Sequence, residues 1–269
     1  MDIQQISITA FDDQRPGTSG LRKTVKTFRV AHYLESFVQS IFDALPDKQK
    51  KSLVIGGDGR YFNREAIQVI VRIAIANGYR ALYIGQHGYL STPAASHFIR
   101  KHKLDGGIIL SASHNPGGPD ADFGIKYNIS NGGPAPEKVT NTIFDISRKL
   151  QHYLTIDCDD VDIDTLQSIQ IGECEISIVD SIGDYADLME HLFDLKLIRG
   201  LFNSGLFNMA FDAMHAITGP YAREIFVRRL GASEESLLNC YPKVDFGGGH
   251  PDPNLAHAHE LVEMMNQPR

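Results

Sequence analysis

In the first half of the chain, short apolar runs typical of buried strands alternate with segments of helical periodicity. Strands are predicted over residues 53–55, 81–84 and 107–110, the second of them ended by Gly85. A first helix is predicted from Asn63, as its capping residue, to a stop at Gly78. A second is predicted from Thr92, as N-cap before Pro93, towards Lys101. This order predicts an α/β fold with a mixed, largely parallel sheet, right-handed crossovers and helices on both faces.

The pattern changes near residue 180, where a domain boundary is expected. Before it, the sequence predicts strands at 125–129 and 176–179, a helix ending at Lys149 and an Asp-rich, solvated connection over 155–170. After it, helices are predicted at 185–194, 220–230 and 254–266, with a strand at 208–211. The expected domains are therefore 1–180 and 181–269. The second ends on a helix with no strand to pair beside 208–211, which predicts that it is incomplete.

Composition narrows the class of protein. The 269 residues are 42% hydrophobic, enough for a substantial core, and the net charge of −7 disfavours nucleic-acid binding. No apolar run is long enough to cross a bilayer, and the N-terminus lacks the pattern of a secretory signal. Three widely spaced cysteines are typical of reduced thiols, so a cytoplasmic location is expected. These features exclude membrane and secreted proteins as first interpretations.

One segment departs from this acidic balance. Residues 14–28 contain no acidic side chain but carry Arg15, Arg22, Lys23 and Lys26. Such a segment could bind a small anion such as a sugar phosphate, or it could be a solvated basic strand. Charge alone leaves both interpretations open.

A serine-centred loop, Ser111-Ala-Ser-His-Asn-Pro-Gly-Gly118, follows the third predicted strand. Its proline fixes φ and its two glycines let the backbone approach a ligand closely. The turn could expose Ser113 as a phosphoryl acceptor at the carboxyl end of a strand, where ligands gather, or it could be an ordinary polar turn. A serine hydrolase is disfavoured because there is no G-x-S-x-G elbow and His114 adjoins the serine in sequence.

This loop resembles the phosphoserine loop of the α-D-phosphohexomutases, and its flanks resemble the phosphoglucomutase branch. Matching segments occur in the family's order along nearly the whole chain: Arg15-Pro-Gly-Thr-Ser-Gly-Leu-Arg22, Gly57-Asp-Gly-Arg60, Leu90-Ser-Thr-Pro93, Phe123-Gly-Ile-Lys126, residues 128–136, Asp212-Ala-Met-His215, Gly219-Pro-Tyr221 and His250-Pro-Asp-Pro-Asn254. Ser111 departs from the family, which often has threonine there. The resemblance implies reversible interconversion of glucose 1-phosphate and glucose 6-phosphate through a phosphoserine and glucose 1,6-bisphosphate.

The resemblance also implies residue roles. Ser113 would carry the phosphoryl group, with His114 and Lys126 assisting proton transfer and orienting charge. Phosphate-binding roles fall on Thr18, Ser19, Arg22 and Asn115. Physical chemistry agrees, because phosphoryl transfer needs cations around the equatorial oxygens and an acid or base for the sugar hydroxyl. A lysine beside other cations is expected to have a lowered pKa that suits this work, whereas the alternative for Lys126 is a surface residue at a strand end.

The family's metal loop is missing from this sequence. The resemblance implies Mg²⁺ held by a D-G-D-G-D-R loop and one phosphoserine oxygen, so Ser113, through its phosphoryl group, is the only expected ligand here. We therefore expect the first domain and most of the second of a four-domain enzyme, inactive alone, with the other two domains as its partners. The segment His257-Ala-His259-Glu260 and the aspartates of residues 157–164 lack the spacing of metal sites, and we interpret them as exposed polar segments.

Two alternatives remain at this stage. Within the enzyme class, a phosphomannomutase or phosphoglucosamine mutase would carry the same serine loop. In another class, a non-catalytic relative would act as a binding protein, but its loop would be expected to decay. Because Ser113, His114, Asn115 and Lys126 are all present, the sequence favours an enzyme acting on hexose phosphates.

Overall fold

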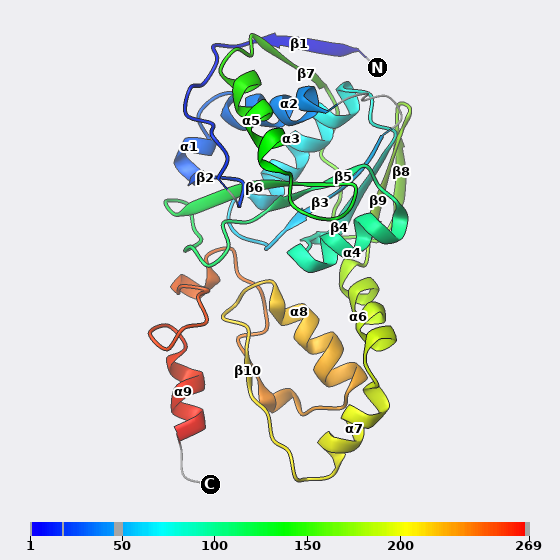
Figure 1. The fold of residues 1–269 in the computed structure, drawn as a ribbon, viewed down its shortest axis with the longest axis vertical. Coiled ribbons are helices and arrows are strands. Elements are labelled where there is room, and N and C mark those ends of the chain that lie inside the picture. The colour runs from blue at the N-terminus through cyan, green and yellow to red at the C-terminus, as the bar shows by residue number, and fades with distance from the viewer. Residues whose placement is uncertain (1, 18, 46–50, 267–269) are drawn as a thin grey trace.

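A seven-stranded mixed sheet forms the centre of the structure, a computed structural model that describes residues 2–17, 19–45 and 51–266 (Figure 1). The strand order is β2 (Leu21–Thr24), β6 (Asp122–Ile129), β5 (Gly106–Leu110), β3 (Ser52–Gly57), β4 (Ala81–Tyr89), β9 (Cys174–Val179) and β8 (Ser168–Ile171). The four strands β5, β3, β4 and β9 are mutually parallel, and the pairs at either end are antiparallel. The predicted α/β class with a parallel centre is confirmed.

Alternating side chains of the central strands fill two cores, one on each face. Leu53 and Ile55 of β3 pack beneath α2 (Tyr33–Ala44) and α3 (Asn63–Ala76), whereas Val54 faces α4 (Thr92–His102). Figure 1 shows α2, α3 and α5 (Glu137–Ser147) on one side of the sheet, with α4 and α6 (Ser181–Leu192) on the other. Strands buried on both faces appear in sequence as continuous apolar runs, which is why β3 and β5 were predictable.

Two predicted helix caps are displaced by one residue. Phe62, not Asn63, is the N-cap of α3; it has φ 74°, and Asn63 is already helical. The ring of Phe62 packs against Phe123 at 5.3 Å, so tertiary packing determines where this helix begins. At α4 the N-cap is Ser91, whose hydroxyl accepts the N–H of Ala94 at 3.3 Å. The predicted stop of α3 at Gly78 is confirmed, since Gly78 follows the C-cap with φ 81°.

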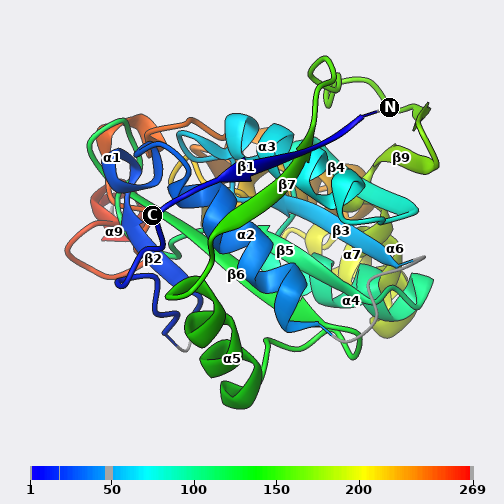
Figure 2. The same cartoon turned by 90° about the horizontal axis from the view of Figure 1, so that it is seen from above.

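Strand β4 does not end at Gly85, and the connection over 155–170 is not fully solvated. Gly85 pairs with Val179 inside the sheet, and the strand continues to Tyr89. Strand β7 (His152–Ile156) pairs with β1 (Ile3–Ser7) across the top of α2 (Figure 2). Beyond it, Val161 is buried because Gln68 of α3 exchanges two hydrogen bonds with its backbone, at 2.9 and 3.0 Å. This side-chain partner, 93 residues away in the sequence, is invisible to a local pattern.

The second part of the chain is smaller and less regular. It contains α6, α7 (Leu195–Asn203), β10 (Phe211–Asp212), α8 (Thr218–Ala222) followed by a π-helix over Arg223–Arg229, β11 (Leu237–Leu238), α9 (His259–Asn266), and 3₁₀ turns at Glu234–Ser236 and Phe246–Gly248. The predicted strand at 208–211 is reduced to the short parallel pair of β10 and β11. The predicted last helix begins at His259 rather than Asn254, because Asn254 accepts the N–H of Ala256 in a turn.

This second part is fixed to the first by buried contacts. Tyr221 of α8 packs in the core beside α4, and its hydroxyl accepts the N–H of Ser91 at 3.1 Å. Asp184 of α6 bonds to Lys101 and lies 3.3 Å from His97, both on α4. No helix in the described part of the chain is long and apolar enough to cross a membrane. The shortest α-helix in that part is α1 (Val25–Phe28).

Candidate functional site

The serine loop joins β5 to β6 at the carboxyl end of β5. Ser113 is exposed and has φ 60°, a left-handed backbone that is uncommon for a residue other than glycine. Its N–H donates to the Ser111 hydroxyl at 2.9 Å, while the Ser111 N–H donates to the carbonyl of Gly124 at 2.8 Å. The loop is thus fixed from below, and its serine hydroxyl makes no hydrogen bond with any described residue. An observed strain of this kind at a strand end is a reason to suspect function.

Arg60 fixes the loop from the side. It follows β3, is only 1% exposed, and its Nε lies 3.0 Å from both carboxylate oxygens of Asp58. Its two other nitrogens donate to the carbonyls of Ser113 at 2.9 Å and Asp122 at 2.8 Å. A planar guanidinium can satisfy all of these acceptors at once, which a lysine could not. Arg60 therefore ties the start of the serine loop to its end.

Asn115 and Gly124 serve the internal geometry of the loop. The Asn115 amide donates to the Asp122 carboxylate at 2.8 Å, so this predicted phosphate-binding residue already has a partner within the loop. A Cβ at Gly124 would lie 2.3 Å from the carbonyl oxygen of Ser111, which only a glycine avoids. His114 is exposed beside Ser113 and has no hydrogen bond or ion pair with a described residue.

Arg22 and Lys126 lie on neighbouring antiparallel strands next to this loop. Arg22 of β2 pairs with Gly124 of β6, and Lys126 is two residues further along β6. Burial lowers the pKa of Lys126, and the charges of Arg22 and Arg60 lower it further against the opposing effect of Asp58. A lowered pKa was the expectation from sequence, although burial rather than neighbouring charge is the larger cause. The Arg22 Nε is buried without a hydrogen-bond partner among the described residues.

Ser19 approaches Lys126 from the N-terminal loop. Gly17 and Gly20 close this loop with reciprocal backbone hydrogen bonds of 2.9 and 3.1 Å. Gln14 anchors it, because its buried amide donates to the Tyr33 carbonyl at 2.6 Å. Thr18, the other predicted phosphate-binding residue here, lies outside the described residues.

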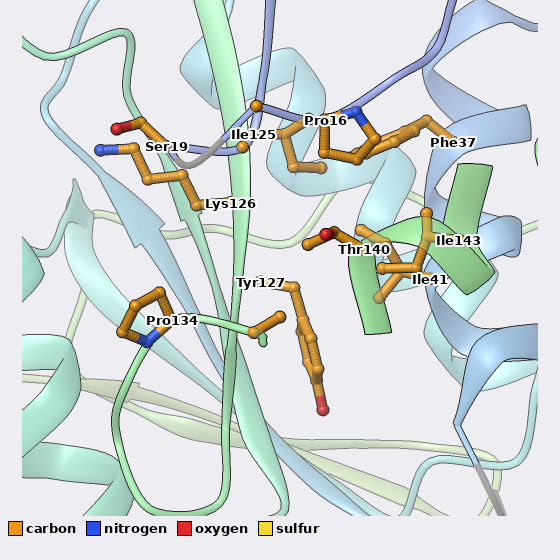
Figure 3. Close-up of a pocket in the computed structure, with 13 residues that line it drawn as sticks. Pro16, Ser19, Phe37, Ile41, Ile125, Lys126, Tyr127, Pro134, Thr140 and Ile143 are labelled. Atoms are coloured by element: carbon orange, nitrogen blue, oxygen red, sulfur yellow. The ribbon is translucent and has the colours of Figure 1, made fainter. Parts of the chain in front are cut away.

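The space beneath this loop is a narrow pocket of about 30 Å³. Figure 3 shows Ser19 and Lys126 together at one side of it, and Phe37, Ile41 and Ile143 at the other. Ser19 and Lys126 therefore sit at one edge of a mainly apolar pocket.

The structure brings most of the predicted residues into one site. Electrostatic and hydrogen-bond contacts run from Arg22 through Lys126, Asp58 and Arg60 to Ser113. The sequence reasoning matched the segment that contains Asp58 and Arg60 but assigned it no role. A signal was present, since two charged residues directly after a buried strand stand where ligands gather in an α/β sheet.

The described residues do not form a metal site. No group of three histidine, cysteine or acidic side chains in residues 2–17, 19–45 and 51–266 is arranged to hold a metal ion. A single serine-borne phosphoryl oxygen is far short of the six ligands that Mg²⁺ prefers. The residues present therefore do not fit a complete Mg²⁺ site.

The site thus consists of an exposed serine at a strand end of an α/β sheet, beside the buried Arg60 and near the half-buried Arg22 and Lys126. The family model of phosphoglucomutase/phosphomannomutase, alpha/beta/alpha domain I, matches residues 13–154. The chain belongs to this family.

Similar proteins extend the match along the chain. A phosphoglucomutase of Emericella nidulans is 54% identical over 99% of this chain and 48% of its own length. A phosphoglucomutase of Populus tremula named cytoplasmic is 50% identical over 98% of this chain and 47% of its own length. The crystal structure of the exocytosis-sensitive phosphoprotein parafusin, a phosphoglucomutase from Paramecium, in its open form, superposes with a TM-score of 0.95 at 47% identity, covering 98% of this chain and 50% of that one.

These comparisons confirm the predicted family and fold. The chain spans about half the length of the curated relatives that it matches.

Proposed function

We propose that this chain carries the phosphoserine half of a phosphoglucomutase active site, which interconverts glucose 1-phosphate and glucose 6-phosphate. The observation that carries the proposal is the exposed Ser113 on its left-handed turn, fixed by the buried Arg60 and flanked by Arg22 and Lys126. Names of relatives near 50% identity favour glucose over mannose or glucosamine as the sugar.

The proposed reaction consists of two phosphoryl transfers, one from the serine to the sugar and one from the sugar back to the serine. The free hydroxyl of the sugar phosphate attacks the phosphorus of phospho-Ser113, breaks its bond to the serine oxygen, and forms glucose 1,6-bisphosphate. The bisphosphate then presents its other phosphoryl group to the freed serine, which restores the phosphoenzyme and releases the isomeric monophosphate. Free glucose 1,6-bisphosphate would act as activator by phosphorylating an unmodified Ser113.

Lys126 and Arg22 suit two different tasks in this reaction. A lysine whose pKa is lowered can accept the proton of the attacking hydroxyl and return it to the leaving oxygen. The Arg22 Nε is a buried donor without a partner, which costs about 1–3 kcal/mol, and a phosphate oxygen would satisfy it. His114, Ser19, Asn115 and Thr18 would complete the polar surroundings of the transferring group.

Three further parts of the proposal concern the whole protein. The Mg²⁺ that the family resemblance implies would be held in part by a phosphoryl oxygen on Ser113, and the described residues supply no complete set of ligands for it. The strands of the large sheet lie before residue 180 and β10 and β11 lie after it, which supports a division into domains 1–180 and 181–269. The name of the poplar relative supports a cytoplasmic location.

The direct test is to find where the phosphate goes. The full-length gene product is incubated with radiolabelled glucose 1,6-bisphosphate, and its labelled peptide is mapped while glucose 1-phosphate conversion is assayed in parallel. We expect label on Ser113 only, and none after Ser113→Ala. Label that stays on Ser111 in this variant would contradict the assignment.

Loss of either flanking cation should slow turnover without unfolding the protein. Removing one preorganised donor at a developing charge costs about 2.7–4 kcal/mol, so Arg22→Ala and Lys126→Ala are each expected to lower kcat by roughly a hundredfold to a thousandfold. Lys23→Ala is the matched control, since it removes a cation from the same strand whose partner is the exposed Asp13 at 2.9 Å. A Lys126→Ala enzyme as active as Lys23→Ala would make Lys126 a surface residue only.

A further inference from the structure

A segment from the second part of the chain lies directly on the serine loop. The carbonyl of Val244 accepts the N–H of Tyr61 at 2.7 Å, next to Arg60. Two residues later, Phe246 is 3% exposed, although its neighbours in residues 241–249 are mostly open to solvent. A Cβ at Gly117 would lie 2.8 Å from the Phe246 ring and 2.9 Å from the Val244 carbonyl. The loop and this segment are therefore in close contact, with only a glycine between them.

The Phe246 ring also covers the arginine that fixes the loop. The Arg60 guanidinium carbon lies 5.1 Å from the centre of this ring, within the range of a cation–π contact. The edge of the same guanidinium donates to the Ser113 carbonyl at 2.9 Å. An aromatic ring over its face keeps water away from these hydrogen bonds, which are stronger in a dry environment. The Phe246 ring thus contacts the Arg60 guanidinium, which in turn binds the backbone of Ser113.

The backbone at Phe246 is strained. Phe246 has φ 54° and is followed by two glycines that also have positive φ. A bulky residue in the left-handed region is an outlier that persists only where its surroundings hold it. Here the packing of the buried ring against Gly117 and Arg60 stabilises the strained backbone. The strained turn is what directs the aromatic side chain into the serine loop.

We propose that Phe246 is a positioning residue for phosphoryl transfer, acting through Arg60 and Gly117 on the serine loop. Its ring contacts Arg60 and lies against Gly117, so its effect on Ser113 is indirect. It keeps the loop against Arg60, so that the phosphoryl group starts each transfer from one place. The kinetic part rests on the proposed mutase function, whereas the contact between the two parts of the chain does not.

The test compares three variants of the full-length gene product by kinetics and by amide hydrogen exchange of residues 113–118. Phe246→Ala is expected to lower kcat by about a hundredfold, the scale of a reacting group misplaced by an ångström, with little change in KM. Exchange in the serine loop should speed up while β3 stays protected. Phe246→Leu restores apolar bulk over Gly117 and should recover most of kcat.

Tyr241→Ala is the matched control. Tyr241 belongs to the same segment and its ring also lies over an arginine, Arg223, at 4.7 Å, but it is 65% exposed. Its removal should leave kcat and loop exchange unchanged. Equal kcat and equal loop exchange in Phe246→Ala and Tyr241→Ala would overturn the proposal.

Two other outcomes are also decisive. A wild-type protein without mutase activity removes the proposed function, and loop exchange alone then decides whether Phe246 holds the loop. If Phe246→Ala also loses the protection of β3, Gly117→Ala is the second variant, because its methyl group must displace the ring. The kcat of Gly117→Ala should fall. Adding Phe246→Leu to this variant should restore part of it, because leucine leaves room for the new methyl group. Wild-type kcat in Gly117→Ala would overturn the proposal.

Discussion

Replacing Ser113 by alanine is expected to lower the mutase kcat by on the order of a millionfold, the scale on which covalent catalysis fails when its nucleophile is removed. In the proposed reaction the serine oxygen gives one phosphoryl group to the sugar and accepts the sugar's other one, and we expect no neighbouring hydroxyl to take its place. Ser111, the nearest candidate, is buried and its oxygen already accepts the Ser113 N–H. The measurement is glucose 1-phosphate conversion by the full-length gene product with bisphosphate present.

Ser111→Ala is the control for the loop itself. It removes one hydrogen bond, worth about 0.5–1.5 kcal/mol, and should cost no more than roughly tenfold in kcat. The exposed Ser113 side chain makes no described hydrogen bond, so Ser113→Ala should unfold at the same temperature as the wild-type protein. Substantial turnover by Ser113→Ala at an unchanged melting temperature would remove Ser113 from the mechanism.

The fold could be predicted wherever local pattern and tertiary packing agree. Strands β3 and β5 are buried on both faces, so their apolar runs suffice, and Gly78 stops α3 because its φ is positive. Prediction failed where distant partners decide. Phe62 takes the cap position because Phe123 packs against it, and the connection carrying Val161 is buried because Gln68 binds its backbone.

The residues of the candidate site could also be predicted only where a local pattern marks them. Ser113 and Lys126 could be found because their loop and strand resemble a family motif. The sequence position of Arg60 pointed to a site, but its role in fixing the loop could not be predicted, because its acceptors there are the backbone carbonyls of Ser113 and Asp122, which no side-chain pattern records. Phe246 is more distant still: it is an aromatic residue between Asp245 and Gly247, more than a hundred residues along the chain from the loop that it touches. Only the folded chain shows what these two residues contact.

Arg60→Ala is expected to destabilise the chain by about 3–5 kcal/mol, the cost of leaving one member of a buried ion pair alone. Asp58 would lose both contacts from the Arg60 Nε, and the carbonyls of Ser113 and Asp122 would lose their donors. For a chain of this size the melting temperature should fall by roughly 6–20 °C. Thermal unfolding followed by circular dichroism measures the shift.

The matched control is another arginine–aspartate pair with two hydrogen bonds. Arg64 donates to both carboxylate oxygens of Asp164 at 2.7 and 2.9 Å, but the two side chains are 52% and 49% exposed. Water screens and replaces such a pair, so Arg64→Ala should cost about 0–1 kcal/mol. Adding Asp58→Asn to Arg60→Ala should recover part of the loss, because it removes the uncompensated buried charge. Equal melting temperatures for Arg60→Ala and Arg64→Ala would mean that burial of the Asp58–Arg60 pair does not hold the serine loop in place.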